Sequence, residues 1–141
     1  MRIALKEAES AFAKDEVPVG AVIVRDNEIV STAHNSTQNL NNALAHAEKI
    51  AIEKAQKEIG KWLLDCKLYV TLEPCPMCTG MIILSRLDSL IFGAFDEKNG
   101  ACGSIYNLLN DTRFNHNPEI KSGILEENCS KILKRFFEEK R

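Results

Sequence analysis

The sequence predicts an α/β protein in which a five-stranded mixed sheet lies between helices on both faces, a three-layer αβα arrangement. Three observations support this fold class. Strand-like segments alternate along the chain with segments whose apolar residues recur at helical spacing. The 141 residues, 45% of them hydrophobic, suffice to bury one core without disulfide cross-links. No internal repeat or linker divides the chain, so we expect a single domain over residues 1–141.

The first third of the chain predicts a helix followed by a hairpin. Apolar residues recur every three or four positions from Met1 to Phe12, which indicates an amphipathic helix that ends at Pro18. The turn residues Asp26-Asn27 tolerate the positive φ angles of a tight hairpin. They join two predicted strands, Val19–Val24 and Glu28–Ala33.

The remaining elements follow from the same periodicities. An asparagine-rich loop precedes a predicted helix in which small and aliphatic residues repeat at every fourth position. Prolines then separate a β-rich segment from the next helix. The predicted ranges are a helix at Ala45–Ile59, a strand at Lys67–Leu72, a helix at Met77–Arg86, a strand at Ser89–Ala94, a short helix at Ser104–Asn110, an edge strand at Glu119–Ile124, and a final helix whose apolar stripe is Leu125, Cys129, Ile132, Leu133 and Phe136.

Charge and cysteine content narrow the functional classes. The formal net charge of −2 excludes a strong overall attraction to nucleic acid or anionic membrane, so RNA contact would need a local patch. Five cysteines, two of them in a CxxC pair, indicate metal or redox chemistry rather than a disulfide framework. No apolar stretch approaches the roughly 20 residues that span a bilayer. We therefore expect a soluble, cytoplasmic protein.

Two segments carry a metal-binding pattern. His46-Ala47-Glu48 is followed further along the chain by Pro74-Cys75-Pro76-Met77-Cys78. Catalytic zinc prefers nitrogen and thiolate ligands and keeps three protein ligands, so that water takes the fourth position. His46, Cys75 and Cys78 supply that set and are predicted to bind one Zn2+ per chain. Together the two segments match the HxE and PCxxC signature of zinc-dependent deaminases.

Glu48 is predicted to be the catalytic residue. It lies two residues beyond His46, on the same predicted helical turn, and can reach a zinc-activated water without being a ligand. Zinc lowers the pKa of its water from about 15.7 to about 7, so a carboxylate can take that proton at neutral pH. Glu48 would then pass protons to the ring nitrogen and to the departing ammonia.

Other interpretations of the cysteines and histidines remain. A CxxC pair alone is equally typical of a structural zinc site or a redox pair. A structural site needs a fourth ligand, which Cys66, Cys102 or Cys129 could provide, although no spacing favours any of them, and core positions are expected for all three. His34 and His116 have no carboxylate two residues later and are predicted not to bind zinc.

Beyond the metal motif, the chain resembles bacterial tRNA-specific adenosine deaminases. The resemblance rests on six segments in order: Glu16-Val17-Pro18-Val19-Gly20-Ala21-Val22, His46-Ala47-Glu48, Thr71-Leu72-Glu73-Pro74-Cys75, Phe92-Gly93-Ala94 with Asp96, Gly103-Ser104, and Asn115-His116. It implies a cytidine-deaminase-like fold and hydrolytic conversion of the wobble adenosine of a tRNA anticodon to inosine. It also implies a homodimer that binds the anticodon stem-loop with both subunits.

The resemblance further implies roles for individual residues. Asn35 is similar to an asparagine that hydrogen-bonds the flipped base, and Val17 and Leu72 match positions that line the base pocket. Contacts with neighbouring nucleotides are implied for Asp96 and Asn115, and Phe136 and Arg141 match the C-terminal helix that meets the anticodon loop. From the residues alone, Val17, Leu72 and Phe136 could equally be core, Asn35 a turn residue, and Asp96 a turn cap.

The chain departs from the family in one segment. Asn42-Ala43-Leu44-Ala45 stands where the family usually has Asp-Pro-Thr-Ala, beside the predicted metal site. The basic cluster Lys131, Lys134, Arg135, Lys140 and Arg141 is the best candidate for phosphate contact, or simply the solvated face of the last helix. Two rival functions are a deaminase of a free base or nucleoside, such as guanine or cytosine, and a non-catalytic RNA-binding or scaffold protein with structural zinc.

Overall fold

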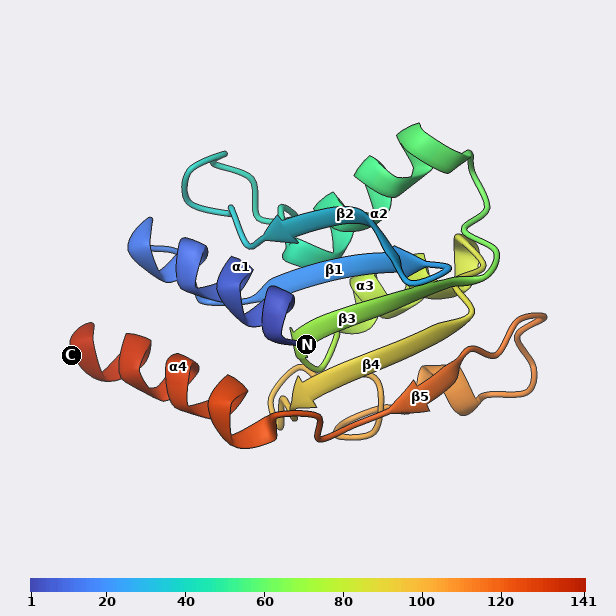
Figure 1. Ribbon diagram of the computed structural model, residues 1–141. Coiled ribbons are helices and arrows are strands. Elements are labelled where there is room, and N and C mark those ends of the chain that lie inside the picture. The colour runs from blue at the N-terminus through green and yellow to red at the C-terminus, as the bar shows by residue number, and fades with distance from the viewer.

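The computed structural model describes residues 1–141 and confirms the predicted fold class. Five strands form one mixed sheet in the order β2-β1-β3-β4-β5, flanked by four α-helices (Figure 1). In chain order the elements are α1 (Arg2–Ala13), β1 (Gly20–Arg25), β2 (Glu28–His34), α2 (Ala47–Ile59), β3 (Cys66–Leu72), α3 (Pro76–Leu84), β4 (Ser89–Ala94), the short 3-10 helix η1 (Leu108–Asn110), β5 (Glu119–Lys121) and α4 (Glu126–Glu139).

The strand directions follow from the connections between them. Strands β1 and β2 form the predicted antiparallel hairpin, whose turn residues Asp26 and Asn27 have φ angles of 51° and 62°. Strand β3 is antiparallel to β1 and parallel to β4, because α3 carries the chain back across the sheet between β3 and β4. Strand β5 completes the sheet parallel to β4.

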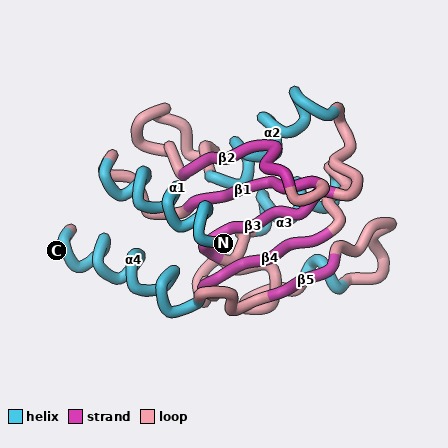
Figure 2. The backbone as a smooth tube through the Cα atoms, in the orientation of Figure 1, coloured by secondary structure: helices cyan, strands magenta, loops and turns pink.

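The sheet is covered on both faces, which explains its apolar central strands. Helices α1 and α4 lie on one face, and α2 and α3 lie on the other (Figure 2). Leu68, Val70, Leu90 and Phe92 on β3 and β4 are fully buried, and each such side chain stabilises the fold by about 1.5–3 kcal/mol. Helix α1 approaches β1 so closely that a Cβ on Gly20 would overlap the backbone of α1.

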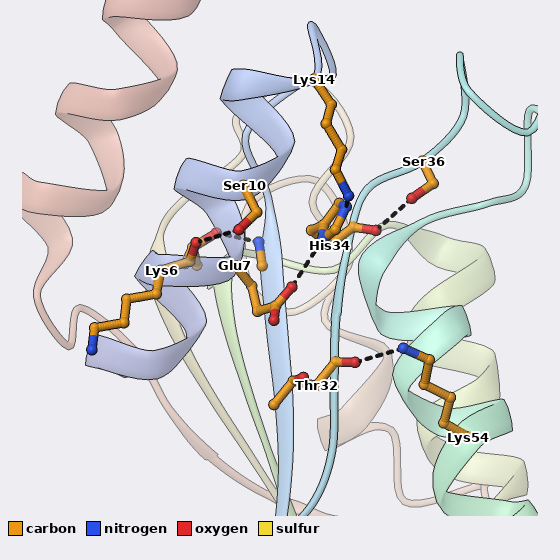
Figure 3. A network of polar contacts seen from close by, with 10 residues as sticks. Lys6, Glu7, Ser10, Lys14, Thr32, His34, Ser36 and Lys54 are labelled. Atoms are coloured by element: carbon orange, nitrogen blue, oxygen red, sulfur yellow. Dashed lines mark hydrogen bonds and ion pairs between the residues drawn. The ribbon is translucent and has the colours of Figure 1, made fainter.

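Polar side-chain contacts connect β2 to α1 on one face of the sheet and to α2 on the other. His34, the last residue of β2, contacts Glu7 of α1 through Nδ1 at 2.8 Å and Lys14 through Nε2 at 3.2 Å (Figure 3). From the other face, the Lys54 ammonium of α2 donates to the carbonyl oxygen of Thr32 at 2.9 Å. These contacts position the end of β2, from which the chain continues to Asn35.

Three helix boundaries differ from the prediction for local reasons. Helix α1 ends at Ala13 rather than at Pro18, because Asp15 has a φ of 62° and turns the chain. Helix α2 begins at Ala47 instead of Ala45, because His46 has an extended ψ of 151° and is the N-cap. Helix α3 runs from Pro76 to Leu84, because Arg86 adopts a left-handed φ of 64°.

The predictions near the C-terminus also need correction. Only the last three residues of the helix predicted over 104–110 are helical, because Cys102 forms a β-bridge with Asn107 and the chain reverses there. The edge strand ends at Lys121, since Gly123 has a φ of 77°. On the final helix Cys129 is fully buried, as expected for the apolar stripe. No helix combines the length and apolar character needed to cross a membrane.

Candidate metal centre and active site

The ends of several strands meet on one side of the sheet, where β3 and β4 finish. Strands β3 and β4 run parallel, so their last residues, Leu72 and Ala94, meet there. Strand β1 runs the opposite way, and its first residue, Gly20, pairs with His34 at the end of β2. The loops before β1 and after β2, β3 and β4 therefore surround a single region.

His46, Cys75 and Cys78 meet in this region. His46 and Cys75 are the N-cap residues of α2 and α3, and Cys78 lies in the first turn of α3. The His46 Nδ1 atom is 3.6 Å from the sulfur of each cysteine, and all three ligand atoms lie within 4.8 Å of one another. A tetrahedral zinc ion separates bound nitrogen and sulfur by about 3.6 Å, given its usual bond lengths. The three side chains fit a zinc ion with one position left for water.

The local electrostatics favour thiolate at this centre. The two helix N-termini place positive dipole ends beside the sulfurs. The cysteines share a proton: a hydrogen bond with Cys78 lowers the pKa of Cys75 to about 4, and the same contact raises the pKa of Cys78. The hydrogen bond to Cys75 raises the pKa of His46. One thiolate, the form that binds zinc, is thus present at neutral pH.

No other cysteine or histidine joins this cluster. Cys66, Cys102 and Cys129 are buried thiols, as expected for core residues, and the potential metal-ligand group contains three residues only. His116 contacts the carbonyl oxygen of Leu87 at 2.6 Å, and His34 is engaged with α1. A structural four-ligand site therefore lacks its fourth protein ligand.

Glu48 lies beside the three ligands in the first turn of α2. Its side chain is 5% exposed, and burial raises its pKa to about 7. A carboxyl group with that pKa can both accept and release a proton near neutrality, which suits acid–base chemistry.

A cavity of about 420 Å³ opens over the metal-ligand cluster. Four of the residues predicted to bind substrate line this cavity: Val17, Asn35, Leu72 and Asp96. A larger hollow of about 910 Å³ between α1 and α4 is lined mainly by charged side chains and contains no metal ligand. The smaller cavity is also lined by Val19, Thr37, His46, Ala47, Glu48, Glu73, Cys75, Pro76 and Asn99.

The other predicted contact residues lie outside this cavity. Phe136 lines a neighbouring hollow of about 480 Å³, which shares Val17 with the cavity. Arg141 lies in a separate groove at the end of α4. Asn115 accepts a hydrogen bond from Arg86 at 3.0 Å, at the opposite edge of the sheet where β4 begins.

The basic cluster on α4 is partly engaged within the chain. The Arg135 guanidinium lies over the Phe12 ring at 4.3 Å, and Lys140 forms an ion pair with Asp15. Lys131 and Lys134 are exposed and form no ion pair. These two lysines and Arg141, which is also exposed and forms no ion pair, are the members of the cluster that remain free for phosphate contact.

Two buried glutamates at or near the cavity, Glu73 and Glu16, are functional candidates that the sequence motifs did not indicate. Glu16 is fully buried and accepts hydrogen bonds from the backbone of Gln38 and Asn39. Glu73 is 2% exposed and accepts hydrogen bonds from the loop after β4. A charged residue inside an apolar segment, as in Leu72-Glu73-Pro74, is the signal that could have indicated them.

Comparisons with known proteins agree with this geometry. The MafB19-like deaminase family matches residues 1–141. The chain is 50% identical to the tRNA-specific adenosine deaminase of Bacillus subtilis (strain 168), over 100% of this chain and 88% of that protein. A solved structure from studies of A-to-I editing by tRNA:A34 deaminases superposes with a TM-score of 0.90 at 41% identity, over 94% of this chain and 97% of that chain. Guanine deaminase from Bacillus subtilis is similar at a TM-score of 0.65 and 30% identity, over 95% of this chain and 89% of that chain.

Proposed function

The chain belongs to the family of tRNA-specific adenosine deaminases, and we propose that it converts the wobble adenosine of a tRNA anticodon to inosine. Water adds at C6 of the adenine ring and the exocyclic amine leaves as ammonia. The observation that carries the proposed deamination is the buried Glu48 carboxyl beside the His-Cys-Cys cluster, at a cavity lined by Glu48, His46 and Cys75. The similarity to tRNA-specific adenosine deaminases supports the wobble adenosine as the substrate. Residues 1–141 would act as a single deaminase domain in the cytoplasm.

His46, Cys75 and Cys78 would hold one zinc ion per chain. When bound, zinc supplies the Lewis acidity that lets a water molecule lose a proton near neutral pH. The thiolate of Cys75 and the N-terminal dipoles of α2 and α3 prepare the ligands for a cation. Cys78 would release its proton when the site is loaded, so zinc affinity should rise with pH.

Glu48 would move the protons of the reaction. Its carboxylate would take a proton from the attacking water and deliver it to N1 of the adenine ring. It would then take the second proton from the hydroxyl group added at C6 and deliver it to the amine, which leaves as ammonia while the carbonyl forms. Its burial keeps bulk water from competing for these transfers.

The base would lie between apolar and amide groups of the cavity. Asn35 is 7% exposed, and its Nδ2 atom donates to the carbonyl oxygen of Val17 at 3.3 Å, which orients the amide. Its Oδ1 atom makes no hydrogen bond within the chain and would contact the polar edge of the base. Val17 and Leu72 supply apolar surface on which the ring can pack.

The rest of the anticodon loop would cross the surface around the cavity. Asp96 at the rim, Phe136 in the adjoining hollow and Arg141 at the end of α4 would contact neighbouring nucleotides. Asn115, at the other edge of the sheet, would contact RNA bound mainly by the second subunit of a homodimer.

A deaminase of a free base is the rival function, because guanine deaminase from Bacillus subtilis shares the fold. The test incubates purified protein with tRNA anticodon stem-loops, guanine and cytosine, and measures inosine, xanthine and uracil in parallel. We expect inosine only, in the stem-loops that carry a wobble adenosine. Turnover of guanine or cytosine without any inosine would refute the proposed substrate.

A further inference from the structure

Glu73 joins the metal-ligand segment to the opposite side of the cavity. It lies between Leu72, which lines the cavity, and Pro74-Cys75, which begins the ligand segment. Its own backbone N–H donates to the carbonyl oxygen of Ala94 at 2.8 Å, continuing the pairing of β3 with β4. Its side chain reaches the loop that follows β4, residues 95–104, which we call the Glu73 loop.

Four donors of this loop surround the Glu73 carboxylate. The backbone N–H of Asp96 donates to Oε1 at 3.1 Å, and those of Cys102 and Ser104 donate to Oε2 at 3.0 Å each. The Ser104 hydroxyl also donates to Oε1. Every partner is a donor and none is a cation, which is the hydrogen-bonding pattern of an ionised carboxylate satisfied by neutral groups.

The loop is shaped to admit this carboxylate. A Cβ on Gly100 would overlap Glu73 Oε2, so the loop backbone lies directly against the acid group. The N–H of Gly100 donates to the carbonyl oxygen of Asp96 at 2.8 Å, and this closes the turn. Asp96 Oδ1 in turn accepts from the N–H groups of Lys98 and Asn99 at 3.1 Å each. Fixing Glu73 therefore fixes the turn that carries Asp96 and Asn99 to the cavity.

We propose that Glu73 is a positioning residue, which holds Asp96 and Asn99 at the substrate by fixing the Glu73 loop. The inference rests on the proposed function. The lone pairs of Glu73 are occupied by the loop, so its carboxylate acts on substrate binding through the loop and leaves proton transfer to Glu48. Its loss should therefore raise KM more than it lowers kcat.

The test compares Glu73→Gln with the control Glu97→Gln, an exposed glutamate of the same loop. The amide keeps the shape of the side chain but turns an NH2 group toward backbone N–H donors, which displaces the loop. With an anticodon stem-loop as substrate, we expect KM to rise about tenfold while kcat changes less than about threefold, because a displaced wall weakens binding more than chemistry. Zinc content should stay at one per chain, and amide hydrogen exchange of Cys102 and Ser104 should accelerate.

A double variant tests whether Glu73 affects KM through Asp96. Because Glu73 acts through Asp96, the rise in KM for Glu73→Gln combined with Asp96→Ala should be smaller than the product of the two single rises. If Glu73→Gln does not fold, Gly100→Ala displaces the same carboxylate without changing it, and should show the same rise in KM.

The outcomes separate this inference from the proposed function. Inactive wild-type protein would refute the proposed function, whereas faster exchange at Cys102 and Ser104 in the variant would still support the role of Glu73 in holding the loop. An active wild type with unchanged KM in both Glu73→Gln and Gly100→Ala would overturn the inference. Lost zinc and lowered kcat at unchanged KM would also overturn it, since they would place the effect of Glu73 on Cys75.

Discussion

Two loops form opposite sides of the cavity, and each is held by a buried glutamate. The Glu73 loop supplies three backbone N–H groups from positions spread over nine residues, with Gly100 pressed against the carboxylate. Glu16 contacts the loop after β2, residues 36–44, which we call the Glu16 loop, only at Thr37, Gln38 and Asn39. Its remaining residues, 40–44, are all exposed, and they include two leucines.

From this difference we expect the two glutamates to restrain their loops unequally. An anchor that binds distant points of a loop fixes its whole path, whereas one that binds three successive residues fixes one end. Glu73 ties its loop on both sides of the turn, whereas residues 40–44 of the Glu16 loop do not contact Glu16 and are held by hydrogen bonds within the loop, such as that from the Asn42 N–H to the Thr37 carbonyl oxygen at 3.0 Å. These exposed residues overlap the segment Asn42 to Ala45, in which the chain departs from the family pattern. We therefore expect substitutions in the Glu73 loop to impair substrate binding more than substitutions in residues 40–44 of the Glu16 loop.

The largest expected effect lies between the two loops, at Glu48. If the loops bind substrate and Glu48 transfers protons, Glu48→Gln should lower kcat for inosine formation about a thousandfold with little change in KM. Zinc per chain, measured by atomic absorption, should stay at one, because Glu48 is not a ligand. The control is Glu58→Gln, an exposed glutamate of the same helix. A Glu48→Gln protein that retains more than a tenth of wild-type kcat would contradict the division of roles.

A feature of the fold or of the site could be predicted from the sequence when residues close together in the chain determine it. Apolar periodicity predicted every main helix and strand, and the spacing around His46 and Cys75 predicted the cluster that the structure brings together. The role of Glu73 was not predictable, because its partners face it only after β4 has paired with β3. Asp96 and Asn115 were grouped together by resemblance, yet strand direction places them at opposite edges of the sheet. Long-range pairing, not residue type, decides such positions.

A smaller effect is expected at Glu16. Glu16→Gln turns an amide toward the N–H groups of Gln38 and Asn39 and should lower the free energy of unfolding by about 1–3 kcal/mol. Because Glu16 contacts only one end of its loop, and backbone hydrogen bonds hold the rest, KM for the stem-loop should rise less than in Glu73→Gln. Urea denaturation and steady-state kinetics measure the two quantities, with the exposed Glu9→Gln as control. An equal or larger rise in KM would show that the two loops are equally fixed and break the comparison.

The smallest expected effect is a gain in stability in the part of the Glu16 loop that does not contact Glu16. Asn42 to Ala45 form a β-turn closed by a hydrogen bond from the Ala45 N–H to the Asn42 carbonyl oxygen at 3.0 Å. Ala43 is the second residue of this turn, where proline is favoured; its φ is not positive, and its N–H makes no hydrogen bond. Ala43→Pro should therefore raise the free energy of unfolding by about 0.5 kcal/mol by restricting the unfolded chain.

Leu44→Pro is the matched control for this turn. The Leu44 N–H donates to Asn42 Oδ1 at 2.9 Å, and proline would remove that bond at a position where it is disfavoured, so this variant should be less stable than the wild type. Urea denaturation of both variants gives the sign of each change. Destabilisation by Ala43→Pro would mean that the turn is strained by proline. A stabilised Ala43→Pro protein with unchanged kcat/KM would show that deamination does not need flexibility at this turn.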